Sequence, residues 1–188
     1  IRLQEELNKS GIRASILKGQ AIAQLYGAEL SLYRAPGDID IYVDCGRERA
    51  FAYTKTIGVH NIRWDYKHLH LNIYDGIDVE MHYVPEILLN VRKNKRLQSW
   101  FKEHKEELFS FTNGFVTPSI RFNLFYILLH IYRHFLYEGV GLRQLMDYYF
   151  VLKAANGEYR EEINALFAKF GMVRFAKGIM WIMKTVFL

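Results

Sequence analysis

The sequence contains a single cysteine, Cys45, and no apolar run as long as a membrane span. A lone cysteine excludes an intrachain disulfide and is typical of a reducing compartment, so we expect a cytoplasmic protein. The lack of a long apolar run predicts no membrane span, and the sequence shows no signal peptide, internal repeat or low-complexity segment. Because the chain begins at Ile1 rather than Met, we interpret it as a segment of a longer protein.

Apolar residues make up 51% of the 188 residues, which is enough to bury the core of one domain or of two small ones. The formal net charge of +5 is compatible with polyanionic partners such as nucleotides or RNA. The basic residues are spread along the chain, apart from the run Arg-Lys-Asn-Lys-Arg at 92–96. We interpret that run as a solvated linker or helix face.

The most informative stretch is Arg-Ala-Pro-Gly-Asp-Ile-Asp-Ile-Tyr-Val-Asp at residues 34–44. Pro36-Gly37 predicts a tight turn that leads into a strand over 38–44. Side chains alternate between the faces of a strand, so Asp38 and Asp40 are expected on one face and the apolar residues on the other. Two neighbouring carboxylates repel each other unless a cation lies between them, which favours a divalent metal. The alternative is that one aspartate caps the turn and the other is solvated.

A second candidate site is the sequence Lys18-Gly19-Gln20, which joins a predicted buried strand over 12–17 to a predicted helix over 21–26. A glycine between a strand and a helix lets the backbone approach a ligand, and the first N–H groups of the helix favour an anion. The alternative is a tight strand-to-helix turn without a ligand.

Two strands over 64–74 and 77–84 are predicted to form a hairpin, because they are joined by Asp75-Gly76. Alternation places Asp78, Glu80 and His82 on one face of the second strand. Glu80 alone would be interpreted as part of a solvated face, but it also supplies the third carboxylate that an Asp38–Asp40 metal site needs. His68 and His70 share a face of the first strand and are weaker candidates, typical also of surface positions.

The remaining sequence is mostly helical, which predicts an α+β fold. We expect an αβ core over 1–85, ended by Pro85, connecting helices and a loop over 86–118, and a helical part over 119–188. Ser119 is a candidate N-cap. The predicted helices cover 1–10, 47–56, one or two within 86–108, 120–137, 142–155, 158–170 and 172–188, and a short strand pair is expected around Asn113-Gly114.

Four ordered segments resemble the nucleotidyltransferase fold of the DNA polymerase β superfamily, and more narrowly a bacterial family of uncharacterised nucleotidyltransferases. The resemblance spans about residues 12–152. It implies a mixed sheet with helices, followed by a helical part that closes a cleft. The matching segments are Leu17-Lys18-Gly19, Tyr33-Arg34 leading into Gly37-Asp38-Ile39-Asp40-Ile41, Asp78-Val79-Glu80-Met81-His82, and Leu129-His130 with His134 followed by Leu142-Arg143-Gln144-Leu145-Met146-Asp147.

This resemblance implies a metal-dependent transfer of a nucleoside monophosphate from an NTP to an acceptor hydroxyl on protein, RNA or a small molecule. It implies that Asp38, Asp40 and Glu80 hold two Mg2+ ions, with Mn2+ as an alternative, and that Glu80 accepts the proton of the acceptor. Glu80 stands where aspartate is more usual. The residues implied to bind the triphosphate are Lys18, Gly19, Gln20 and Arg34. His82 shares a strand face with Glu80 and is expected either to orient Glu80 or to lie near the acceptor.

Further residues are implied to line the cleft: His130, Arg143 and Asp147. Arg143 and Asp147 are also spaced to pair across one helical turn. His130 and His134 have a spacing that suits zinc, but no third ligand accompanies them, so we reject a zinc site there.

The sequence departs from the superfamily at Gly19-Gln20, where Gly-Ser or Gly-Gly is usual. Two further functions therefore stay open. One is nucleotide transfer to a partner protein, as in toxin–antitoxin pairs, and the other is a catalytically silent binding or antitoxin-type module.

Overall fold

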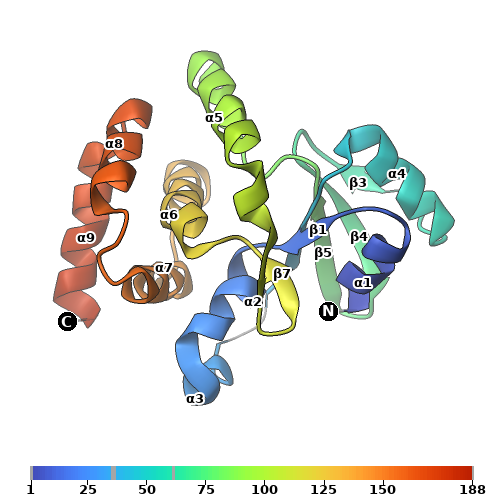
Figure 1. The fold of residues 1–188 in the computed structure, drawn as a ribbon, viewed down its shortest axis with the longest axis horizontal. Helices are drawn as coiled ribbons and strands as arrows, with labels where there is room; N and C mark the ends of the chain where they lie inside the picture. The colour runs from blue at the N-terminus through green and yellow to red at the C-terminus, as the bar shows by residue number, and fades with distance from the viewer. Residues whose placement is uncertain (1, 35–36, 61, 188) are drawn as a thin grey trace. The chain divides into compact units, whose positions relative to one another are not determined.

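The computed structural model describes residues 2–34, 37–60 and 62–187. They group into two compact units, each described here by itself (Figure 1). The first unit comprises the described residues of 1–24 and 35–118, and the second comprises 25–34 together with those of 119–188. The three-part division expected from the sequence stays a prediction.

The first unit is built on a five-stranded mixed sheet (Figure 1). Strands β2 and β5 run parallel, and the other neighbouring pairs are antiparallel. In spatial order the strands are β1 (Ala14–Ile16), β2 (Ile39–Val43), β5 (Ile77–His82), β4 (His68–Tyr74) and β3 (Arg63–Trp64).

One face of this sheet forms the core of the unit. The odd-numbered residues of the central strands, such as Ile41, Leu69 and Met81, are fully buried there. They pack in one cluster with residues of α1 (Arg2–Lys9) and α4 (Gly46–Thr56). Alternation therefore directs the even-numbered side chains of β2, β4 and β5 to the opposite face, as the sequence predicts.

The strand predicted over 64–74 is two strands in the structure. The Asp65 carboxylate accepts hydrogen bonds from the backbone N–H groups of Lys67 (2.8 Å) and His68 (3.0 Å). This Asx-type turn folds the chain back, so that Trp64 pairs with Leu69.

The hairpin at Asp75-Gly76 is confirmed, because Tyr74 pairs with Ile77. Gly76 has a φ of +71°, a conformation that glycine adopts without steric cost. The strand predicted over 38–44 runs from Ile39 to Val43, so Asp38 lies just ahead of it. A turn was predicted at Pro36-Gly37, but Pro36 lies outside the described residues.

A second hairpin pairs β6 (Ser110–Thr112) with β7 (Phe115–Thr117) around Asn113-Gly114, as predicted. It is tied to the first helix by the buried Gln4. The Gln4 amide nitrogen donates to the carbonyl of Val116 (2.9 Å), and its oxygen accepts from the Val116 N–H (2.9 Å). The connection between β5 and this hairpin holds α5 (Val91–Glu103) and the 3-10 helix η2 (Lys105–Phe109).

After β1 the chain forms α2 (Lys18–Ala23), a 3-10 turn η1 (Gln24–Tyr26) and α3 (Gly27–Ser31). Helix α2 therefore begins three residues earlier than predicted. Gly27, with a φ of +78°, separates η1 from the short helix α3, which the sequence did not predict.

The second unit contains α6 (Ile120–Tyr137), α7 (Leu142–Ala155), α8 (Arg160–Phe170) and α9 (Val173–Phe187). These helices agree closely with the predicted ranges. The Ser119 hydroxyl accepts a hydrogen bond from the N–H of Phe122 (3.1 Å), which confirms the predicted N-cap of α6. Among the residues that the structure describes, none of the helices combines the length and apolar character needed to cross a membrane.

Candidate active site

The register of two parallel strands brings the predicted carboxylates together. Asp40 on β2 pairs with Glu80 on β5, so residues 40 positions apart occupy adjacent strands about 4.8 Å from each other. Asp38 is exposed to solvent just before β2, and its backbone carbonyl accepts a hydrogen bond from the Gln20 amide (3.0 Å). We refer to Asp38, Asp40 and Glu80 as the carboxylate triad.

Lys18 supplies the positive charge next to the triad. Its Nζ lies 2.5 Å from Oδ1 of Asp40, and both side chains are buried. Burial opposes the charged form of each group, but their mutual attraction outweighs it, together with the hydrogen bond of His82 to Asp40 and the charge of Glu86 near Lys18. The pKa of Asp40 therefore lies well below its usual range and the pKa of Lys18 is raised. The pair is therefore ionised.

The backbone of Lys18 adopts an unusual conformation, with a φ of +48°. A left-handed conformation costs a residue with a Cβ about 1–2 kcal/mol. The adjacent Leu17 N–H donates to the carbonyl of Asp40 (2.8 Å), which fixes the end of β1 against β2. Strained residues of this kind cluster at functional sites, and here the strain accompanies an ammonium group bound to the central carboxylate.

His82 links the two buried members of the triad. Its Nε2 lies 2.8 Å from Oδ1 of Asp40 and 3.3 Å from Oε2 of Glu80, and its side chain is fully buried. Burial by itself raises the pKa of Glu80, but the hydrogen bond from His82, together with the charges of His82 and His68, brings this pKa to about 2. Glu80 is therefore a carboxylate at neutral pH. That His82 orients Glu80 for a reaction stays a prediction.

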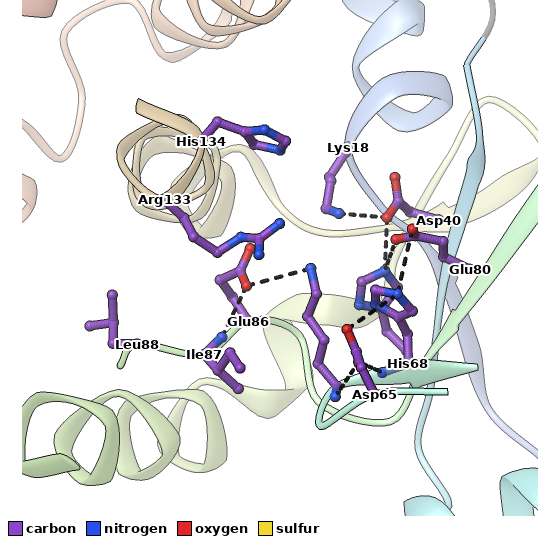
Figure 2. A network of polar contacts seen from close by, with 12 residues as sticks. Lys18, Asp40, Asp65, His68, Glu80, Glu86, Ile87, Leu88, Arg133 and His134 are labelled. Carbon is purple, nitrogen blue, oxygen red and sulfur yellow. Dashed lines mark hydrogen bonds and ion pairs between the residues drawn. The ribbon is translucent and has the colours of Figure 1, made fainter. Parts of the chain in front are cut away.

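His68 is part of the site, although its sequence position also suited a surface strand residue. It is buried on β4, where it pairs with His82, and its Nε2 lies 3.5 Å from Oε1 of Glu80 (Figure 2). Burial first, and then the neighbouring His82, lower the pKa of His68 to about 4. The turn at Asp75-Gly76 alone would pair His68 with Tyr83. An irregularity between Leu71 and Tyr74 shifts the register by one residue and sets His68 across from His82, so no signal in the sequence indicated this contact.

The side chains of the site carry an excess of negative charge that a divalent cation would balance. The triad carries three negative charges when ionised, and Lys18 cancels one of them. Lys67, the other buried lysine nearby, lies 3.6 Å from the buried Glu86 and is balanced by it. Partial burial, followed by the charges of Asp40 and Glu80, raises the pKa of Asp38. The oxygen ligands and the excess negative charge fit Mg2+.

Two of the residues predicted to bind triphosphate, Lys18 and Gln20, contact the aspartates of the carboxylate triad. Lys18 and Gly19 open α2, a helix of six residues, and no side chain caps its N-terminus. The Lys18 ammonium is bound to Asp40, and the Gln20 side chain is bound to the carbonyl of Asp38. A triphosphate-binding role for Lys18, Gly19 and Gln20 stays a prediction.

Arg34, which the resemblance implied to bind substrate, is paired with a carboxylate of the second unit. Its guanidinium forms a bidentate pair with Asp147 of α7, with Nε 2.9 Å from Oδ1 and Nη2 2.8 Å from Oδ2. The hydroxyl of Tyr26 donates to the same Oδ1 (2.7 Å). The partners of Asp147 are thus supplied by the segment 25–34, within the second unit, and not by a neighbour one helical turn away.

The other predicted cleft residues also lie in the second unit. The ring of His130 on α6 lies 4.3 Å from that of His134, in an edge-on contact, and Arg143 lies in the first turn of α7. That these residues line a cleft stays a prediction.

No curated protein and no solved structure gives a match to this chain. One protein-family model, described as an uncharacterised nucleotidyltransferase, matches residues 1–187. The match confirms the resemblance seen in the four ordered segments, without showing a bacterial origin, and the mixed sheet followed by a helical unit fits an α+β nucleotidyltransferase-like fold. Because the match covers nearly the whole chain, this protein belongs to the family of uncharacterised nucleotidyltransferases.

Proposed function

We propose that this chain transfers a nucleoside monophosphate from an NTP to an acceptor hydroxyl, with the carboxylate triad at the reacting centre. Membership of the family supports nucleotidyl transfer in general. The observation that carries the proposal is the register of β2 and β5, which sets Asp40 beside Glu80, with Asp38 two residues before Asp40 in the chain.

Asp38, Asp40 and Glu80 would hold Mg2+, with Mn2+ as the alternative, and the bound ion would polarise the transferred phosphate and offset the charge of the leaving pyrophosphate. The remaining residues prepare this group. Lys18 keeps Asp40 ionised, and His82 holds Asp40 and Glu80 in fixed orientations. A pKa of about 2 makes Glu80 a weak base, so we assign it the role of a ligand, and the proton of the acceptor hydroxyl would pass to solvent water.

The binding step can be tested by measuring whether a nucleotide raises the melting temperature, and whether this rise requires a divalent metal. In the presence of Mg2+, one of the four NTPs is expected to stabilise the parent protein, by about 2.7 kcal/mol at a hundredfold excess over Kd. Asp38→Asn should abolish this shift, because it removes an exposed ligand without stranding Lys18. Asp40→Asn is a poorer test, since it leaves the buried ammonium uncompensated.

Asp75→Asn provides the matched control. Asp75 is exposed at the hairpin turn, and Asn-Gly is as good a turn sequence as Asp-Gly. The control should keep the full shift. A shift in Asp38→Asn equal to that of the parent would overturn the assignment of Asp38 to the site.

A nucleotide-binding module without transfer activity is the second candidate, and the ion pair between Lys18 and Asp40 favours it, because the ammonium already occupies one oxygen of that carboxylate. An NTP labelled at its α-phosphate distinguishes the two. Label incorporated into RNA, protein or a small-molecule acceptor, with equimolar pyrophosphate released, supports transfer. Binding without either product supports the silent module.

A further inference from the structure

Three histidines gather around Glu80 on the polar face of the sheet. The antiparallel register of β4 and β5 pairs His68 with His82 and His70 with Glu80. Figure 2 shows His68 and Glu80 within one network of contacts. We call His68, His70, His82 and Glu80 the histidine cluster. The proposed nucleotidyl transfer uses Glu80 and His82 from this cluster and gives no role to the other two.

The spacing of the ligand atoms in the histidine cluster suits a single metal ion. Two ligands that each lie about 2.0–2.1 Å from an ion are separated from each other by about 3.0–3.4 Å. The Nε2 atoms of His68 and His70 are 3.1 Å apart. Nε2 of His82 lies 3.3 Å from Glu80 Oε2, and Nε2 of His68 lies 3.5 Å from Glu80 Oε1.

One ligand atom from each of His68, Glu80 and His82 lies close to the other two. Each offers one ligand atom, and all three atoms lie within 4.8 Å of one another. A small closing movement of the side chains would bring all three to bonding distance of one ion. Their positions on paired strands limit how far they can separate, so the set is held together by the sheet itself.

The histidines that would bind the ion are held inside the protein. His68 and His82 are only 4% and 0% exposed. The Nδ1 atoms of His68, His70 and His82 are buried and have no hydrogen-bond partner among the residues that the structure describes. Coordination through Nε2 would fix each ring with its proton on Nδ1, but it would not pair these Nδ1 atoms, so the inference rests on the spacing of the ligand atoms.

We propose that His68, Glu80 and His82 form a binding site for a divalent transition-metal ion of the Zn2+ class, with His70 as a fourth ligand. Imidazole nitrogen suits such ions, whereas Mg2+ prefers oxygen. The site shares Glu80 with the carboxylate triad, and coordination through Nε2 of His82 would replace the hydrogen bonds of that atom to Asp40 and Glu80. It does not depend on the protein being a nucleotidyltransferase.

Metal binding by the full chain, freed of metal with a chelator and kept without nucleotide, tests this site. Calorimetry with Zn2+ is expected to give one ion per chain, with a Kd at least 100-fold below that for Mg2+. Titration with Co2+ should give the visible absorption bands of a nitrogen-coordinated ion. His68→Gln should raise the Kd for Zn2+ at least tenfold and weaken the Co2+ bands.

His60→Gln is the matched control, because His60 is exposed and lies outside the cluster. It should bind Zn2+ like the parent. Circular dichroism checks the fold of each variant, and His70→Gln, at a half-buried position, replaces His68→Gln if the latter does not fold. Equal affinities for Zn2+ and Mg2+, or Zn2+ binding that is unchanged in these two cluster variants, would overturn the proposal.

The outcome is separable from that of the proposed function. A chain that binds Zn2+ through His68 but never binds an NTP would refute the nucleotidyl-transfer proposal alone. A chain that binds an NTP with Mg2+ but shows no Zn2+ site would refute the inference about the histidine cluster alone.

Discussion

At the scale of single residues, Lys18 determines the electrostatics of the site. It is a buried lysine with a left-handed backbone, and its ammonium lies 2.5 Å from Asp40. The sequence identified Lys18 as a candidate anion ligand, because it precedes a glycine at the start of a helix. Its contact with a carboxylate 22 positions later could not be predicted, since it depends on how β1 and α2 are placed beside β2.

We expect Lys18→Met to lower the free energy of unfolding by about 3 kcal/mol, because it leaves the buried Asp40 carboxylate without its main counter-charge. Urea denaturation measures the loss. Lys55→Met, at an exposed position of α4, is the control and should change stability by less than 0.5 kcal/mol, the range of about ±0.5 typical of surface substitutions. A loss below about 1 kcal/mol for Lys18→Met would show that His82 alone is sufficient to hold Asp40.

At the scale of elements, local sequence signals predicted the two hairpin turns and the start of α6. Asp75-Gly76, Asn113-Gly114 and Ser119 all act as expected. The prediction over 64–74 was wrong, because the Asp65 side chain satisfies two backbone N–H groups and ends the first strand. An apolar–polar alternation does not reveal such a turn, as the alternation continues through it.

The conformation of Gly76 gives a test of the central hairpin. No atom lies within 4 Å of a Cβ added there, so Gly76→Ala costs only the strain of its φ of +71°. We expect a loss of about 1 kcal/mol in the free energy of unfolding, measured by urea denaturation. Gly76→Asn should lose less, because asparagine tolerates this conformation better. Equal losses in the two variants would argue against backbone strain as the cause.

At the scale of the whole molecule, the helical unit includes a segment from early in the chain. Residues 25–34 belong with 119–188, and the Tyr26 ring stacks on Phe150 at 4.0 Å between centroids. The bidentate pair between Arg34 and Asp147 also joins the segment 25–34 to α7. The helical unit is therefore discontinuous in sequence.

Removal of this ion pair should loosen the helical unit selectively. Arg34→Gln leaves Asp147, a largely buried carboxylate, without its bidentate partner, so we expect a loss of about 2 kcal/mol. Amide hydrogen exchange in α7 should then be about thirtyfold faster. Arg174→Gln, at an exposed position of α9, should leave exchange in α7 unchanged. Unchanged exchange in the Arg34 variant would mean that the stacking of Tyr26 on Phe150 is sufficient to hold the segment 25–34 against α7.

The sequence by itself determined the alternation of the central strands, the periodicity of the long helices, the turns at Asp75-Gly76 and Asn113-Gly114, and the N-cap at Ser119. These features depend on neighbours within a few residues, so local spacing is enough to predict them. The tertiary structure decided which strand lies beside which, and with it the meeting of Asp40 with Glu80, Lys18 and His82. The same register assembled the histidine cluster, and the packing of 25–34 gave Arg34 to Asp147. Such contacts join residues far apart in the chain, and only the paired backbones fix which side chains face one another.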